Sequence, residues 1–106
     1  MNYIYKNNEI YVKKDDGDFL VHCTFSFFKK GIVNIDHTYV DPSLRGKGEA
    51  SKLLHATMKY LKSRKLNVVA SCPYAVKWLN KKEEYNDMII KDKSISEGCK
   101  IIWNHF

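Results

Sequence analysis

The sequence predicts one mixed α+β domain, in which an antiparallel meander precedes a strand-loop-helix-strand crossover and a second helix. Up to residue 40, the chain contains runs that are rich in aromatic and β-branched residues, as strands are. From residue 49 the apolar residues recur at the spacing of a helix, and a short apolar segment follows. The 106 residues suffice for one domain, with a core at about residues 9–90 and a C-terminal extension at 91–106.

Three segments of the first half are expected to form the meander. Glu9–Val12 is the first strand, and Phe19–Phe28 is a long second strand that is rich in aromatic and β-branched residues. Ile32–Val40 is the third strand. Turn residues separate the strands, and Gly17 and Gly31 supply the backbone angles that tight turns require.

Regular alternation along the third strand assigns its side chains to two faces. Residues 33, 35 and 37 share one face, and residues 34, 36 and 38 share the other. This pattern places His37 on the same face as Ile35 and opposite to Asp36.

The second half is expected to add the crossover and the second helix. Glu49–Arg64 carries an apolar stripe opposite a row of lysines, as in an amphipathic helix that packs on a sheet. Leu66–Ser71 reads as a short buried strand, so the order strand, helix, strand implies a right-handed parallel crossover. Pro73 suits the first turn of a second helix that runs to about Lys82.

The end of the chain gives weaker indications. Met88–Ile90 is expected to be a further strand. The extension 91–106 includes Ile101, Ile102, Trp103 and Phe106, which are too apolar for a free tail. We expect it to pack on the domain or on another chain, and the sequence does not fix the oligomeric state.

Charge and hydropathy narrow the classes of partner. The formal charge of +6, from 18 Lys and Arg against 12 Asp and Glu residues, favours anionic partners. The lysines are scattered, however, and no RNA-binding aromatic signature occurs, which argues against a nucleic-acid-binding protein. Neither a signal-peptide segment nor a bilayer-spanning stretch occurs. We therefore expect a soluble, cytoplasmic protein without a membrane partner.

The cysteines favour a reducing compartment. Cys23, Cys72 and Cys99 are an odd set without the spacing of a zinc site or a Cys-x-x-Cys pair. This pattern predicts reduced thiols rather than disulfides, and no metal site.

The segment Asp41–Ala50 connects the third strand to the first helix, and the chain is organised around it. Gly46 and Gly48 let the backbone turn tightly and bring its N–H groups near a ligand, while the helix directs its partially positive end to the same place. Arg45 and Lys47 add formal positive charge. The segment predicts a site for phosphate oxygens; an ordinary strand-to-helix turn is the alternative.

Within this segment, Arg45, Gly48 and Ala50 match the pattern Gln/Arg-x-x-Gly-x-Gly/Ala. The segment thus resembles the acetyl-CoA motif of the GNAT acetyltransferase superfamily. Very short GNAT-like proteins of about a hundred residues are more similar still, and the resemblance covers residues 9–90. It includes three further blocks in the same order: Ile35-Asp36-His37-Thr38, Ser71-Cys72-Pro73-Tyr74 and Glu84-Tyr85.

The resemblance implies a compact GNAT-like fold, an N-acetyltransferase activity, acetyl-CoA as co-substrate and an amine acceptor that the sequence does not identify. It implies that loop backbone groups hold the pyrophosphate, that Ser51 adds a hydroxyl donor, and that the pantetheine arm pairs beside the end of the third strand. The implied cofactor-binding residues are Thr38, Tyr39, Val40, Arg45, Gly46, Lys47, Gly48, Glu49, Ala50, Ser51, Pro73 and Tyr74. Glu49 replaces a usual aliphatic residue, and its charge opposes the pyrophosphate unless it points away.

Cys72 and His37 are the candidate catalytic residues. Cys72 ends a parallel strand and precedes a helix N-terminus, which stabilises a thiolate, so it is an acyl-accepting nucleophile, a pocket-lining residue or simply a small buried side chain. His37 is the candidate base because the ordinary pKa of imidazole lies near neutral pH; a histidine satisfied within the sheet is the alternative.

The remaining residues of this kind are interpreted as packing or surface residues. His22, His55 and His105 lack a supporting context, and Cys23 is expected in the core. Tyr74, Trp78 and Tyr85 either frame a pocket or belong to the core, and the core interpretation is preferred for Trp78.

Three functions are therefore carried forward. The first is acetyl transfer to an amine, and the second is a CoA-binding module with little catalysis. The third, a small basic nucleic-acid-binding protein, is the weakest because the basic residues are dispersed.

Overall fold

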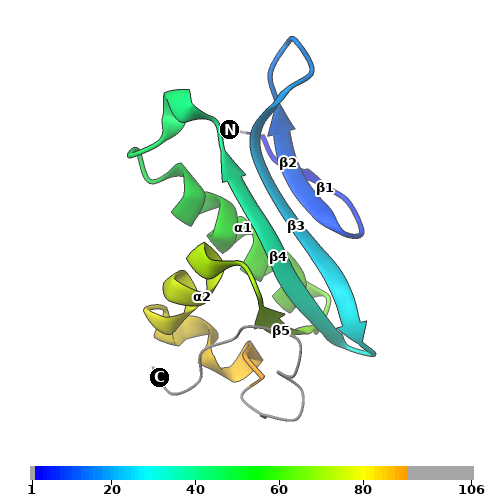
Figure 1. Ribbon diagram of the computed structural model, residues 1–106. Helices are drawn as coiled ribbons and strands as arrows, with labels where there is room; N and C mark the ends of the chain where they lie inside the picture. Colours follow the sequence, from blue (N-terminus) through cyan, green and yellow to red (C-terminus); the bar gives the residue numbers. More distant parts are fainter. Residues whose placement is uncertain (1, 91–106) are drawn as a thin grey trace.

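The computed structural model describes residues 2–90, which contain one five-stranded sheet in the order β1-β2-β3-β4-β5 (Figure 1). Strands β1 to β4 pair antiparallel, and β5 pairs parallel to β4. The expectations for Cys99, His105 and the extension lie outside the described residues. The elements are β1 Ile4–Tyr5, β2 Glu9–Lys13, β3 Phe19–Lys29, β4 Ile32–Val40, η1 Pro42–Leu44, α1 Glu49–Ser63, β5 Asn67–Ala70, α2 Pro73–Asn80 and η2 Glu83–Met88.

The predicted fold class and order of elements are confirmed. The meander consists of β2, β3 and β4, and α1 connects β4 to its parallel neighbour β5. Gly31 has φ of +78° in the turn between β3 and β4, a conformation that glycine adopts without strain.

Two parts of the chain differ from the prediction. Strand β1 was not expected, since two residues are too short to show a period. The expected strand Met88–Ile90 is wrong: η2 occupies residues 83–88, and Ile89 makes an isolated bridge to Val68. Burial of Met88 within η2 and the bond from the Ile90 amide to the Val68 carbonyl leave a single bridge in place of a strand.

A β-bulge in β4 changes the faces of its side chains. Thr24 pairs with His37 and Phe25 with Ile35, so Asp36 is the extra residue. The expectation that His37 shares a face with Ile35 is therefore wrong. After the bulge, Thr38 pairs with the buried Cys23, and His37 is exposed on the opposite face.

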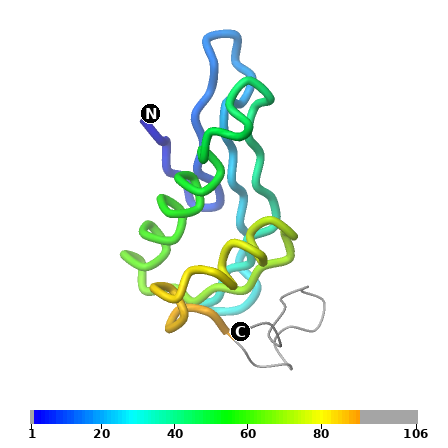
Figure 2. The backbone as a smooth tube through the Cα atoms, turned by 90° about the vertical axis from the view of Figure 1, so that its left-hand side faces the viewer, coloured from blue at the N-terminus to red at the C-terminus, as the bar shows by residue number. Residues whose placement is uncertain are grey.

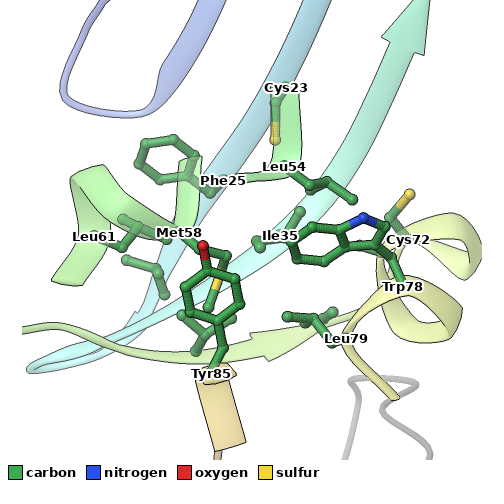
Figure 3. Packing of buried hydrophobic residues seen from close by; sticks show 14 of the residues in the cluster. Cys23, Phe25, Ile35, Leu54, Met58, Leu61, Cys72, Trp78, Leu79 and Tyr85 are labelled. Atoms are coloured by element: carbon green, nitrogen blue, oxygen red, sulfur yellow. The ribbon is translucent and has the colours of Figure 1, made fainter. Parts of the chain in front are cut away.

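The core lies between the sheet and its helices. Figure 2 shows α1 running along one side of the strands. Its buried residues Leu53, Leu54, Met58 and Leu61 share one core cluster with side chains from β3, β4 and α2. Figure 3 shows Leu54, Met58 and Leu61 in this cluster. The buried Thr57 hydroxyl is satisfied by the Leu53 carbonyl at 2.9 Å. Within residues 2–90, no helix combines the length and apolar character that crossing a membrane requires.

Candidate functional site

The loop between β4 and α1 lies where β4 ends at the rim of the sheet (Figure 1). Asp41 caps η1 by accepting a bond from the Ser43 amide. Gly46 and Gly48 then have φ of +81° and +77°, and Gly48 is the N-cap of α1. A Cβ added at either glycine would meet no atom within 4 Å, so both glycines border open space.

The unpaired backbone N–H groups belong to two loop glycines and to the first turn of α1. Among the described residues, the amides of Gly46, Gly48, Glu49, Ala50 and Ser51 have no hydrogen-bond acceptor, whereas those of Arg45 and Lys47 bond to the Pro42 and Leu44 carbonyls at 3.3 Å each. The unpaired donors gather at the start of a 15-residue helix, where the helix dipole adds partial positive charge. This end of α1 can therefore receive an anion.

A concavity of about 340 Å³ lies against this loop. It brings together residues that are far apart in the sequence, because Tyr74 at the start of α2 joins the loop residues. Its lining consists of Val40, Leu44, Arg45, Gly46, Gly48, Glu49, Ala50 and Tyr74. Six of the predicted cofactor-binding positions after residue 39 thus share one cavity with Tyr74.

Strands β4 and β5 separate beside this cavity. They pair only from Ile32 with Asn67 to Ile35 with Ala70. The amides of Ser71 and Cys72 both bond to the Ile35 carbonyl, at 3.1 and 3.2 Å, and the chain then turns into α2. The β5 side of residues 36–40 consequently has no strand partner within the described chain, which leaves an edge for an extended ligand.

Two charged side chains of this site, Arg45 and Glu49, are already engaged. Arg45 Nε donates to the Val40 carbonyl at 3.0 Å, so this arginine braces the loop against the end of β4. Lys52 Nζ lies 3.3 Å from Glu49 Oε1. The pKa of Tyr3 is raised, mainly by burial and then by the Glu49 charge. Because Lys52 is its cationic partner, the Glu49 carboxylate repels a bound anion less than an unpaired carboxylate would.

Cys72 lies on the helix side of the sheet. It is 8% exposed and forms the N-cap of α2, and its thiol donates to Thr38 Oγ1 at 3.7 Å. Thr38 also pairs across the sheet with Cys23. Burial raises the pKa of the Cys23 thiol to about 11. Both cysteines are free thiols near this threonine, and Figure 3 shows them within the core region.

His37 belongs to a different group on the opposite face. Its ring centroid is 6.3 Å from that of His22 in an edge-on arrangement. His22 Nε2 donates to Glu9 Oε1 at 2.7 Å, and its ring stacks on Phe19 at 3.8 Å. The structure thus brings Cys72 to one side of β4 and His37 to the other, and gives His22 the context that its sequence did not show.

A second polar cluster, on α1, α2 and η2, was also missed in the sequence. Trp78 Nε1 donates to Ser51 Oγ at 2.8 Å, and His55 Nδ1 shares a bond of 2.9 Å with the Tyr85 hydroxyl. Ser51 and His55 are four residues apart, a spacing that places both on one helix face and would have indicated the cluster. Because the Ser51 oxygen accepts from Trp78, its own proton remains available to a ligand.

These features define a small α+β domain suited to an extended, phosphate-bearing ligand at a helix N-terminus. Residues 9–88 match the family model of the GCN5-related N-acetyl-transferases. A comparison with curated protein sequences gave no significant match.

Solved structures agree with this match. A GCN5-like N-acetyltransferase candidate from Staphylococcus aureus, determined by NMR, is 31% identical with a TM-score of 0.71, over 84% of this chain and 87% of that one. An acetyltransferase from Bacillus cereus is 25% identical with a TM-score of 0.52, over 65% of this chain and 53% of that one. A Mycobacterium tuberculosis protein in complex with CoA shares the fold at 13% identity and a TM-score of 0.55, over 85% of this chain and 63% of that one.

The chain belongs to the GCN5-related N-acetyltransferase family. The predicted recognition and enzyme class are thereby confirmed, while the acceptor is not specified by the comparisons. The chain covers less than two thirds of the length of the Bacillus cereus and Mycobacterium tuberculosis proteins.

Proposed function

We infer that the protein transfers an acetyl group from acetyl-CoA to an amine, with the pyrophosphate bound at the start of α1. The observation that carries this proposal is the group of unpaired amides at Gly46 and from Gly48 to Ser51, which adjoins a cavity of about 340 Å³. Several N–H donors directed at one diphosphate offset its desolvation better than a single flexible lysine does. The CoA complex of the Mycobacterium tuberculosis protein with the same fold supports the choice of ligand.

The pantetheine arm is proposed to lie along the unpaired edge of β4. Residues Thr38 to Val40 follow the point where β5 leaves, so their backbone groups can pair with the amides of the arm. The Val40 carbonyl already accepts from Arg45, which leaves Thr38 as the main pairing position. The cofactor set is completed by Pro73 and Tyr74, since Tyr74 lines the loop cavity.

Two chemical routes are open to the thioester end. In direct transfer, His37 takes a proton from the ammonium, the free amine nitrogen attacks the thioester carbonyl, the C–S bond breaks, and the CoA thiolate takes up a proton. In the covalent route, the Cys72 thiolate attacks the thioester carbonyl and displaces the CoA thiolate, which takes up a proton; the free amine then attacks the acetyl-cysteine, loses a proton and releases the Cys72 thiolate. The burial of Cys72 and the exposure of His37 favour direct transfer.

Calorimetry with acetyl-CoA tests the binding half of this proposal, and we expect saturable heat at micromolar to high-micromolar ligand. Intact mass spectrometry after incubation with acetyl-CoA separates the two routes. A single acetyl adduct that Cys72→Ser removes would establish the covalent route, and turnover that survives in Cys72→Ser but falls in His37→Gln would establish direct transfer. A protein that gives no heat with acetyl-CoA would contradict the proposal.

A CoA-binding module with little catalysis is the second candidate. It is favoured by the position of Cys72 and His37 on opposite faces of β4, which prevents them from acting as a contacting pair. Binding without thioester loss across a panel of amines would support it. We propose a cytoplasmic location for either function, because the thiols of Cys23 and Cys72 are both free.

A further inference from the structure

A second concavity lies on the face of the sheet that carries His37. It has a volume of about 310 Å³ and is formed by β2, β3, β4 and the adjoining turns. Residues His22, His37 and Tyr39 line it from the strands, and Lys14, Asp18 and Asp41 line it from the turns. We call it the open-face pocket. The function proposed above assigns only His37 and Tyr39 of this set.

The geometry of β4 makes this face the accessible side of the proposed thioester position. On the helix side, Thr38 faces the fully buried Cys23, and Cys72 is itself only 8% exposed. The bulge at Asp36 directs His37 to the other side, where it is exposed. An acceptor that must reach both His37 and the edge of β4 can therefore approach only from the open face.

The pocket has the chemistry of an ammonium site. Lys14 Nζ lies 3.1 Å from Asp41 Oδ1, and the pKa of Lys14 is raised by this bond and further by the charges of Asp41, Asp16 and Asp18. One carboxylate thus pairs with Lys14 and the charges of two others lie near it, although the chain as a whole has a charge of +6.

The aromatic residues beside the pocket provide an independent indication. The ammonium of Lys13 lies 5.5 Å from the ring centroid of Tyr11 and 5.2 Å from that of Phe19, within the range of a cation–π interaction. Phe19 also lines the pocket and stacks on His22. Carboxylate and aromatic groups here thus attract ammonium groups of the chain itself. Among the described residues no ion pair involves Asp18, so its carboxylate is the part of the lining open to an acceptor ammonium.

We propose that the open-face pocket binds the acceptor as a cationic primary amine. His22, which is held by Glu9, positions the ammonium group of this acceptor for deprotonation by His37. This inference rests on the proposed acetyl transfer. The Glu9–His22 bond of 2.7 Å and the stacking on Phe19 fix the His22 ring, which lies in an edge-to-face arrangement with the His37 ring at a centroid distance of 6.3 Å. The proton passes from the ammonium to His37, and the neutral nitrogen then attacks the thioester carbon as described above.

The test uses 1,4-diaminobutane and butylamine as probes, with butyrate as the anion of matched length. In NMR titrations of the free protein, both amines are expected to shift the imidazole signals of His22 and His37 saturably, and butyrate is not. Asp18→Asn is expected to weaken diaminobutane binding about two- to fivefold, as for a partly exposed ion pair. The control Asp87→Asn removes an equal charge from the exposed end of η2 and is expected to leave binding unchanged.

Kinetics separate positioning by His22 from a structural role. His22→Gln is expected to raise KM for the amine several-fold while the Kd for acetyl-CoA stays unchanged. Unchanged amine KM in His22→Gln, equal effects of Asp18→Asn and Asp87→Asn, or equal shifts with butyrate would each overturn the proposal. Acetyl-CoA binding measured in parallel keeps the two proposals apart: heat with acetyl-CoA but no amine-induced shifts refutes the pocket alone, and amine-induced shifts without heat refute the cofactor site alone.

Discussion

Gly48 offers the most direct test of the loop at the level of one residue. Its φ of +77° costs an L-residue about 1 kcal/mol or more, and a Cβ at this position would contact no atom within 4 Å. We expect Gly48→Ala to lower the free energy of unfolding by about 1 kcal/mol and to weaken acetyl-CoA binding, because the methyl group would enter the ligand cavity. Urea unfolding and calorimetry measure the two effects.

Gly31 is the matched control for this substitution. Its φ of +78° is almost the same, its Cβ would also meet no atom within 4 Å, and it lies in the β3–β4 turn, outside the residues assigned to the site. Gly31→Ala is expected to lower stability to a similar extent while acetyl-CoA affinity stays at the wild-type value. Equal affinities in the two variants would show that the loop at Gly48 does not contact the ligand.

Asp41 gives a prediction on pH dependence. The Ser43 hydroxyl, the Lys14 ammonium and the Ser43 amide lower the pKa of this carboxyl to about 2, from an ordinary value of 3.8. Because the pKa is lower in the folded protein, the charged form contributes stability above about pH 4, and this contribution is lost as the pH falls from about 4 to about 2.

The variant Asp41→Asn should therefore unfold at lower urea concentration than wild type at pH 7, and the difference should shrink toward pH 2. The exposed Asp87 supplies the control, since Asp87→Asn removes the same charge without these three donors. A difference between Asp41→Asn and wild type that stays constant from pH 7 to pH 2 would contradict the assignment.

The residue scale also shows which parts of the site the sequence could predict. Gly46 and Gly48 were identified because a tight strand-to-helix turn is a local property, and both have positive φ. The face on which His37 lies was not predicted correctly, because a bulge depends on how two strands pair rather than on either strand alone. The same reason concealed His22, whose partners Glu9 and Phe19 become its neighbours only after the strands pair.

At the scale of elements, α2 is held against α1 through Trp78. This side chain is 6% exposed, donates to Ser51 Oγ at 2.8 Å, and packs edge-on against His55 at 4.8 Å. We expect Trp78→Ala to lower the free energy of unfolding by about 3–5 kcal/mol. Trp78→Phe keeps an aromatic ring but loses the donor, and should cost about 1 kcal/mol for the lost bond plus a smaller packing loss.

Urea unfolding followed by circular dichroism compares the two variants. Equal losses in Trp78→Phe and Trp78→Ala would show that the hydrogen bond to Ser51, rather than the ring, fixes α2. The interpretation of Trp78 as a core residue agrees with its burial, and its bond to Ser51 adds a direct connection from the core to the start of α1.

The elements that the sequence missed are short. Strand β1 has two residues and pairs only with β2, so neither period nor composition distinguishes it from a loop. The segment 83–90 contains a strand-like apolar run, but the burial of Tyr85 and Met88 from η2 decides its conformation. Local propensity predicted the long elements well because a packed face extends over several turns or residues in each.

At the scale of the whole molecule, one sheet separates two chemical environments. The helix side is apolar and contains both described thiols, and the opposite side carries the histidine pair and the carboxylates of the open-face pocket. The β4–α1 loop lies at the shared edge. A ligand that enters along this edge would contact the loop, α2 and β4 together, so binding should stabilise the entire domain.

We therefore expect acetyl-CoA to raise the unfolding temperature of the whole domain in a single transition. At a ligand concentration of 100 times Kd, linkage predicts about 2.7 kcal/mol of added stability, which corresponds to a shift on the order of 10 °C for a domain of this size. Pantetheine, which lacks the pyrophosphate, should give a much smaller shift at the same concentration, because it leaves the amides of Gly46 and of Gly48 to Ser51 unpaired. Differential scanning calorimetry measures both shifts. Equal shifts with acetyl-CoA and pantetheine would mean that the amides at the start of α1 contribute nothing to recognition, since the pyrophosphate is the group for which their number and direction are suited.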